Sequence, residues 1–147
     1  ILILDEPTAG LDPKERIRFR NLISEISGDR IVVFSTHIVS DIEYIAREVM
    51  LIKKGFLLKK DTPTNILKEI EGKVWQIEIP EAALHNIKQK YKVGNIRRKQ
   101  ERIEVRVISE EKPSPSAVQI EPGMEDIYLY YFDEEAETNG TLETRAI

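Results

Sequence analysis

The chain begins with Ile1-Leu2-Ile3-Leu4-Asp5-Glu6-Pro7, an aliphatic run that leads directly into two adjacent carboxylates. Four consecutive aliphatic residues are typical of a strand that is buried on both faces of a parallel sheet. A strand of this kind can deliver a metal-binding aspartate and a catalytic glutamate to the edge of a nucleotide site. Asp5 and Glu6 are therefore the first candidate functional residues.

A helix and a second apolar strand are predicted to follow this stretch. Asp12 can cap a helix whose first position is Pro13, and Glu15 has the spacing that closes a capping box. Gly28 marks the end of the helix. Ile31-Val32-Val33-Phe34 is a second run typical of a buried strand. A helix between two such strands predicts a βαβ unit with parallel strands.

Three more short elements are predicted before residue 72. Ser40 and Glu43 have capping-box spacing and indicate a short helix. Residues 49–58 are predicted to form a β-hairpin, because two apolar runs flank a Lys-Lys-Gly turn. Thr62-Pro63 begins a further short helix that ends before Gly72. Residues 1–72 are therefore interpreted as one module.

Residues 73–132 are predicted to form a second module with the element order β-α-β-β-β-α. Apolar and polar residues alternate over 75–79 and again over 102–108, which is typical of half-buried strands. The order indicates a small α+β sheet with its helices on one face. Residues 133–147 are acidic and then rich in Thr, Asn and Gly, and they are predicted to be a disordered tail.

The composition excludes several classes of function. The 147 residues, 41% hydrophobic and 33% charged, indicate a soluble globular protein of one or two small domains. A net charge of −4 argues against a nucleic-acid-binding surface. The sequence has no cysteine and two histidines, which excludes disulfides and disfavours a zinc site. No apolar run approaches the roughly 18 residues of a membrane span, and no signal-peptide pattern is present.

Two more motifs follow the Asp5-Glu6 pair in a fixed order, Ala9-Gly10-Leu11-Asp12 and Ser35-Thr36-His37. The ordered set of three resembles the second half of an ATP-binding cassette (ABC) nucleotide-binding domain. The resemblance implies an α/β fold in which residues 1–72 are part of the parallel sheet of a P-loop NTPase. Residues 73–132 are similar to the small α+β accessory domain that follows many bacterial export cassettes. The sequence contains no G-x-x-x-x-G-K-[ST] phosphate loop, so the chain is interpreted as a fragment.

The resemblance implies roles for four residues of these motifs. Asp5 would hold Mg²⁺, Glu6 would be the general base that activates water, and His37 would contact the γ-phosphate. Asp12 would contact a second cassette across a shared ATP site, in addition to capping its helix. An isolated carboxylate pair or histidine is more often solvated, and it is the order of the motifs that favours function. His85 lacks such a context and is interpreted as solvated.

The function implied by the resemblance is ATP hydrolysis by a subunit of a bacterial ABC transporter, expected to be an exporter, with ATP and Mg²⁺ as cofactors. Its partners would be a membrane subunit and a second nucleotide-binding subunit, with a homodimer expected, in the cytoplasm at the inner face of the cell membrane. Without a phosphate loop, the chain alone is expected to bind ATP weakly or not at all and to be inactive.

Two other interpretations of the sequence stay open. The first is a non-enzymatic regulatory or dimerisation module of such a transporter, whose useful part is residues 73–132. The second is an ABC ATPase of DNA repair or translation, which fits residues 1–60 equally well. The second module and the acidic charge make this last interpretation the weaker one.

Overall fold

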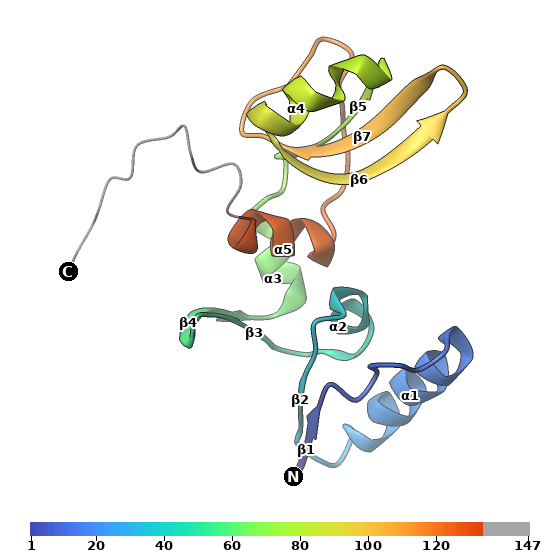
Figure 1. The fold of residues 1–147 in the computed structure, drawn as a ribbon. Coiled ribbons are helices and arrows are strands. Elements are labelled where there is room, and N and C mark those ends of the chain that lie inside the picture. Colours follow the sequence, from blue (N-terminus) through green and yellow to red (C-terminus); the bar gives the residue numbers. More distant parts are fainter. Residues whose placement is uncertain (134–147) are drawn as a thin grey trace, which may run out of the picture. The chain divides into compact units, whose positions relative to one another are not determined.

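The computed structural model describes residues 1–133, which divide into two compact units, Ile1–Ile66 and the residues from Leu67 onward (Figure 1). The predicted disordered tail, residues 133–147, lies outside the described residues except for Asp133.

The first unit opens with the βαβ arrangement that the sequence predicts. Strand β1 (Leu2–Asp5) pairs in parallel with strand β2 (Val32–Ser35), and helix α1 (Pro13–Ile26) connects them. The register sets Asp5 opposite Ser35, the last residues of the two strands. Because parallel strands end at the same edge of a sheet, the polar residues that follow β1 and β2 are brought to one place.

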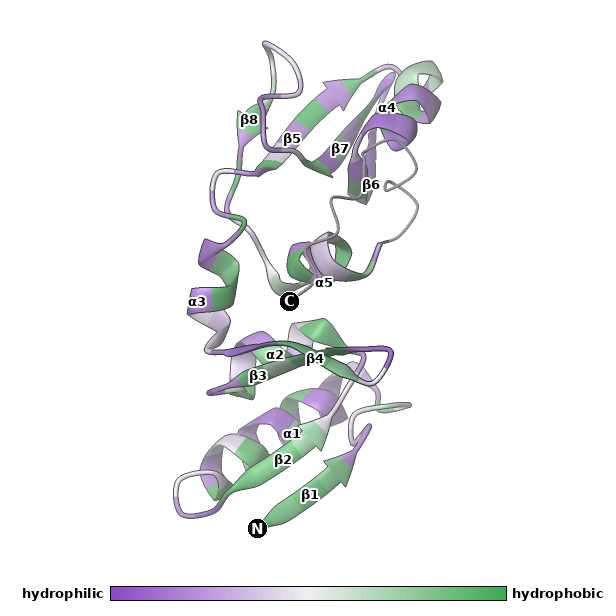
Figure 2. Cartoon of the chain, turned by 90° about the vertical axis from the view of Figure 1, so that its left-hand side faces the viewer, coloured by the Kyte–Doolittle hydropathy of each residue, from purple (hydrophilic) through white to green (hydrophobic). Residues whose placement is uncertain are grey.

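The prediction that both strands are buried on both faces is wrong for this structure. Alternate side chains of β1 and β2 are exposed, with Ile3 at 76% and Val33 at 43%. Within residues 1–133, β1 and β2 pair with each other and with no third strand. Successive side chains of a strand point to opposite faces, so the apolar run places aliphatic groups on both faces while only one is covered. Figure 2 shows that both strands are hydrophobic along most of their length.

Helix α1 begins as predicted, with half of the expected capping box. Asp12 is the N-cap, and its Oδ1 accepts a hydrogen bond from the backbone N–H of Glu15 at 2.9 Å. The Glu15 side chain does not close the box; it pairs with Arg18 Nη1 at 2.6 Å. The C-cap is Ser27, one residue before the predicted stop at Gly28.

A second helix, α2 (Val39–Ile45), follows β2 after three residues. The predicted capping box of Ser40 and Glu43 is wrong, because the helix begins at Val39 and Ser40 lies inside it. Its N-cap is Ile38, which offers no side-chain cap. Thr36 Oγ1 instead accepts a hydrogen bond from the backbone N–H of Ile38 at 3.0 Å.

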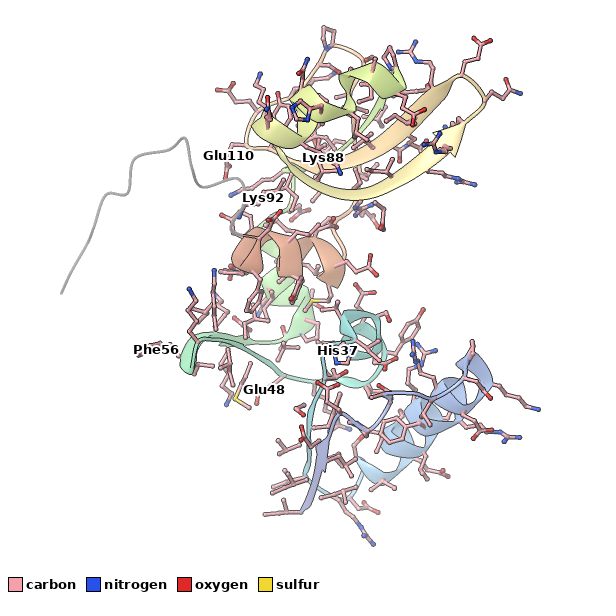
Figure 3. The ribbon with its side chains drawn as sticks, in the orientation of Figure 1. His37, Glu48, Phe56, Lys88, Lys92 and Glu110 are labelled. Atoms are coloured by element: carbon pink, nitrogen blue, oxygen red, sulfur yellow. The ribbon has the colours of Figure 1, made fainter. Side chains whose placement is uncertain are left out.

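The predicted hairpin is confirmed as strands β3 (Val49–Lys53) and β4 (Phe56–Asp61), which pair antiparallel. Its two turn residues, Lys54 (φ +52°) and Gly55 (φ +83°), are both left-handed. This is the backbone of the tight turns that match the twist of a hairpin. Phe56 follows the turn with its ring largely exposed (Figure 3). The short helix α3 (Pro63–Lys68) comes next.

The second unit has the predicted order of elements. Its four strands form an antiparallel sheet in the order β6-β7-β5-β8. The elements are β5 (Val74–Ile79), the 3₁₀-helix η1 (Glu81–Ala83), α4 (Leu84–Lys90), β6 (Lys92–Lys99), β7 (Arg102–Ile108), β8 (Val118–Gln119) and α5 (Met124–Phe132).

The prediction that the helices of this unit share one face of the sheet is wrong. Val105 and Val107 belong to a buried cluster against which Leu84 and Ile87 of α4 pack. Arg106 alternates with these two valines and therefore points to the other face. There its guanidinium binds Asp126 of α5. Helix α5 thus covers the opposite face, because a charged residue of β7 binds it there.

The hydroxyl of Tyr131 on α5 is expected to ionise unusually late. It donates a hydrogen bond to Glu69, and burial together with this carboxylate raises the pKa of Tyr131 from 10.0 to about 12. The folded state therefore favours the protonated phenol. Its contribution to stability is complete below pH 10.0 and is lost as the pH rises through about 12.

Tyrosinate absorbance of the whole chain measures this titration. The part of the absorbance increase that appears at the highest pH should be missing in Tyr131→Phe. In Glu69→Gln, the same part should appear at lower pH. An unchanged titration curve in both variants would contradict the contact.

Candidate functional site

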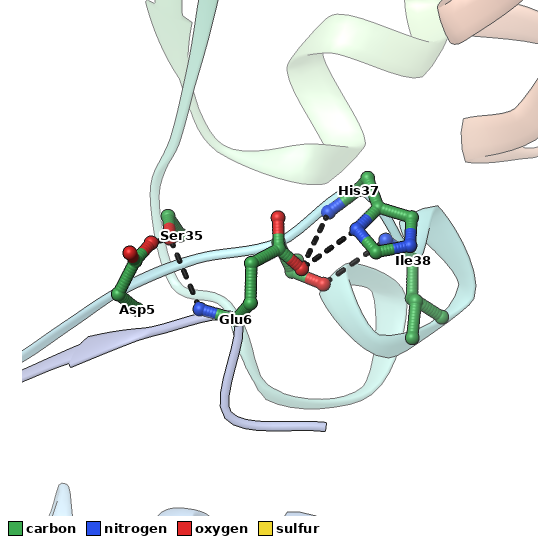
Figure 4. Close-up of polar contacts among 6 residues, drawn as sticks. Asp5, Glu6, Ser35, His37 and Ile38 are labelled. Atoms are coloured by element: carbon green, nitrogen blue, oxygen red, sulfur yellow. Dashed lines mark hydrogen bonds and ion pairs between the residues drawn. The ribbon is translucent and has the colours of Figure 1, made fainter. Parts of the chain in front are cut away.

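The candidate site lies where β1 and β2 end. The Ser35 hydroxyl donates a hydrogen bond to Asp5 Oδ1 across the strand pair (Figure 4). The same hydroxyl accepts from the backbone N–H of Glu6 at 3.2 Å, and the Ser35 carbonyl accepts from that N–H at 3.1 Å. Ser35 therefore fixes the Asp5 carboxylate and the Glu6 backbone at once.

Glu6 turns sharply away from the strand. Its φ of +46° lies in the left-handed region, which is uncommon for a residue other than glycine. In this conformation its carboxylate reaches the chain that follows β2. Glu6 Oε2 lies 2.7 Å from His37 Nδ1 and accepts from the His37 backbone N–H at 3.4 Å (Figure 4). The turn at Glu6 thus brings the second carboxylate onto His37.

The contact assigns the tautomer of His37. An ionised carboxylate can only accept hydrogen bonds, so Nδ1 must carry the proton that faces Glu6. Nε2 is then left for another partner. Among residues 1–133, Oε2 is the only oxygen of the Glu6 carboxylate with a hydrogen-bond partner. One oxygen of Glu6 and one nitrogen of His37 therefore stay available to a ligand or to water.

The site is open to solvent. The His37 side chain is 71% exposed, so a ligand can approach its imidazole. An exposed contact of this kind contributes roughly 0–1 kcal/mol to stability. The arrangement depends instead on the backbone hydrogen bonds that Glu6 and His37 also make.

Asp12 is not part of this group. Its carboxylate caps α1, which confirms the capping half of the dual role expected for it. Asp12 is exposed, so the carboxylate oxygen that does not cap the helix stays accessible. The structure therefore brings Asp5, Glu6 and His37 together and leaves Asp12 at the start of α1.

The residues of the site fit a magnesium ion with few protein ligands. Residues 1–133 contain no group of three or more His, Cys, Asp or Glu side chains that could hold a metal. Mg²⁺ usually keeps several waters and takes one or two carboxylates plus substrate phosphates. The exposed carboxylate of Asp5, oriented by the Ser35 hydroxyl, suits that pattern.

Ser35 is the residue of this site to which the sequence analysis assigned no role. The sequence did contain a signal for this role, because Ser35 is the last residue of the second strand, as Asp5 is of the first. Finding the contact also needs the register of the two strands, which sets these residues opposite each other.

Comparison with known proteins shows what this chain is similar to. No protein-family model matches it. Relatives named as transporter ATP-binding proteins cover about 60% of the chain, which confirms the resemblance to part of an ABC ATP-binding cassette.

The relatives include the energy-coupling factor transporter ATP-binding protein EcfA2 of Lactococcus lactis subsp. cremoris, 37% identical over 98 residues, or 65% of this chain and 34% of the relative. EcfA2 of Staphylococcus epidermidis is 31% identical over 96 residues, 62% of this chain and 34% of the relative. The human ATP-binding cassette sub-family A member 9 is 44% identical over 57 residues, 39% of this chain and 4% of the relative. The chain thus spans about a third of the length of the EcfA2 relatives.

None of the helices in the described part of the chain combines the length and the hydrophobicity that a membrane crossing needs.

Proposed function

We propose that this chain is part of the ATP-hydrolysing subunit of a bacterial ABC transporter, with Glu6 and His37 at the centre of its chemistry. The observation that carries the proposal is the contact of 2.7 Å between Glu6 Oε2 and His37 Nδ1, beside the Asp5 carboxylate. The relatives that match the chain are ATP-binding subunits of transporters by name, which supports the same class.

Each side chain of the site has a separate task in this proposal. Asp5 holds the Mg²⁺ of Mg-ATP, which neutralises charge on the phosphates. Glu6 accepts the proton of the attacking water on its carboxylate. His37 orients Glu6 through Nδ1–H, and its other nitrogen, when protonated, donates a hydrogen bond to an anionic phosphate oxygen.

The partners follow from the same class. Asp12 contacts a second nucleotide-binding subunit across the shared ATP site, and the favoured assembly is a homodimer. A membrane subunit holds the protein at the inner face of the cell membrane. Residues 73–132 are the accessory domain of such a protein, and their similarity to the domain that follows many bacterial export cassettes favours export as the direction of transport.

A hybrid protein tests the proposal. The segment of Lactococcus lactis EcfA2 that matches this chain is exchanged for the residues of this chain. The hybrid should release phosphate from Mg-ATP, because the relative supplies the rest of the ATP-binding protein. A hybrid that folds and binds ATP without hydrolysing it would contradict the proposed roles of Glu6 and His37.

The isolated chain of 147 residues is expected to show no ATP hydrolysis. Its sequence contains no glycine-rich phosphate loop, whose backbone N–H groups and lysine supply most of the affinity for phosphates. Phosphate release by the purified chain with Mg-ATP is the measurement. Turnover that Glu6→Gln abolishes would show that the chain needs no such loop.

A further inference from the structure

Helix α2, which begins two residues after His37, has little to stabilise it locally. It has seven residues and no side-chain N-cap. Isolated helices shorter than about 12–15 residues are marginal in water. The position of α2, and with it the position of His37, must therefore come from contacts with other elements.

Arg20 of α1 supplies two such contacts. Its Nε lies 3.9 Å from Asp41 Oδ1, and its Cζ lies 4.3 Å from the centre of the Tyr44 ring. Asp41 and Tyr44 are three residues apart on α2 and therefore share one face of that helix. One guanidinium thus binds a charge and an aromatic ring on neighbouring turns of α2.

The Asp41 carboxylate is buried, and the proposed chemistry of the site gives it no role. Its side chain is 0% exposed, and neither oxygen has a hydrogen-bond partner among residues 1–133. A carboxylate in such a place is normally paired. At 3.9 Å, Arg20 is an ion-pair partner and not a hydrogen-bond donor. The attraction of Arg20 is therefore the main interaction that keeps this charge buried.

We propose that Arg20 and Asp41 are positioning residues that hold α2 against α1 and so keep His37 beside Glu6. The connection between β2 and α2 is short, and the hydrogen bond between Ile38 N–H and Thr36 Oγ1 restrains it. A shift of α2 is therefore passed on to His37. The inference rests on the proposed function of Glu6 and His37, and it adds the residues that set their geometry.

Nitrogen NMR of the two imidazoles in the full chain tests the inference. At a pH where both rings are neutral, His37 should hold its proton on Nδ1, facing Glu6, and Glu6→Gln should change that signal. Arg20→Gln should lower the ratio of Nδ1- to Nε2-protonated His37, because α2 then loses its contact with Arg20 and no longer holds His37 firmly beside Glu6. His85, whose Nε2 lies 3.1 Å from Gln89 Nε2 in the other unit, is the internal reference.

Three further variants make the result decisive: Arg18→Gln, Asp41→Asn and the double variant Arg20→Gln/Asp41→Asn. Arg18→Gln removes the same charge from an exposed position of α1 and should leave His37 unchanged. The double variant Arg20→Gln/Asp41→Asn leaves no unpaired buried charge, so it should fold even where Arg20→Gln does not. The change of its His37 signal should be smaller than the sum of the changes in the two single variants.

An unchanged His37 in Arg20→Gln, an equal effect of Arg18→Gln, or additive effects in the double variant would each overturn the inference. The NMR signals do not depend on ATP hydrolysis. A failure of the proposed function in the hybrid protein is therefore separate from a failure of this inference.

Discussion

Replacing Glu6 by glutamine in the hybrid that hydrolyses ATP is expected to lower kcat by roughly 10²–10⁴-fold, the usual contribution of a general base. Glutamine has nearly the same shape and keeps an oxygen that can accept from His37, but it cannot take a proton from water. The affinity for Mg-ATP should change little, because Asp5 and not Glu6 is assigned to the metal. His37→Ala should also remove most of the activity, since it leaves the Glu6 carboxylate without its partner at 2.7 Å.

Steady-state phosphate release and a separate ATP-binding measurement check this expectation. Glu48→Gln is the matched control, because it makes the same chemical change at an exposed position of the same unit (Figure 3). There Glu48 pairs with Lys60 at 3.4 Å. The kcat of this variant should stay within about twofold of the parent, as an exposed pair of this kind is weak. A Glu6→Gln protein with the kcat of Glu48→Gln would mean that another group is the base.

The second large effect concerns the stability of the second unit. Asp126→Ala is expected to lower the free energy of unfolding by about 3–5 kcal/mol, the range for breaking a buried ion pair. Asp126 Oδ1 and Oδ2 accept from Arg106 Nε and Nη2 at 2.7 and 2.6 Å, and Oδ2 also accepts from the Gly123 N–H at 2.7 Å. The variant leaves the Arg106 guanidinium half-buried without its carboxylate and removes the side chain that binds the start of α5.

Urea unfolding followed by tryptophan fluorescence measures this loss. Trp75 is the single tryptophan of the chain and belongs to the second unit, where its Nε1–H donates to the Ser109 carbonyl at 3.0 Å. Glu125→Ala removes an exposed carboxylate of the same helix and should cost less than about 1 kcal/mol. Equal losses in Asp126→Ala and Glu125→Ala would contradict the role of the buried pair.

The order and type of the elements could be predicted from the sequence because they depend on local signals. The Asp12-Pro13 start of α1, the Lys54-Gly55 turn and the alternation over 102–108 each act over a few residues. The start of α2 could not be predicted from local signals, because it depends on the path of the chain after β2. The helix begins at Val39, so Ser40 lies inside it and does not cap it.

The sequence by itself determined which residues are candidates for the site, since the carboxylates and the histidine follow apolar runs that form strands. Only the tertiary structure decided how they meet. The parallel register sets Asp5 opposite Ser35, and the left-handed backbone at Glu6 aims its carboxylate at His37. The tertiary structure also placed α4 and α5 on opposite faces of one sheet and paired Arg20 with Asp41. These contacts join residues from 20 to 31 positions apart, and their geometry depends on strand register and helix packing, which no local pattern encodes.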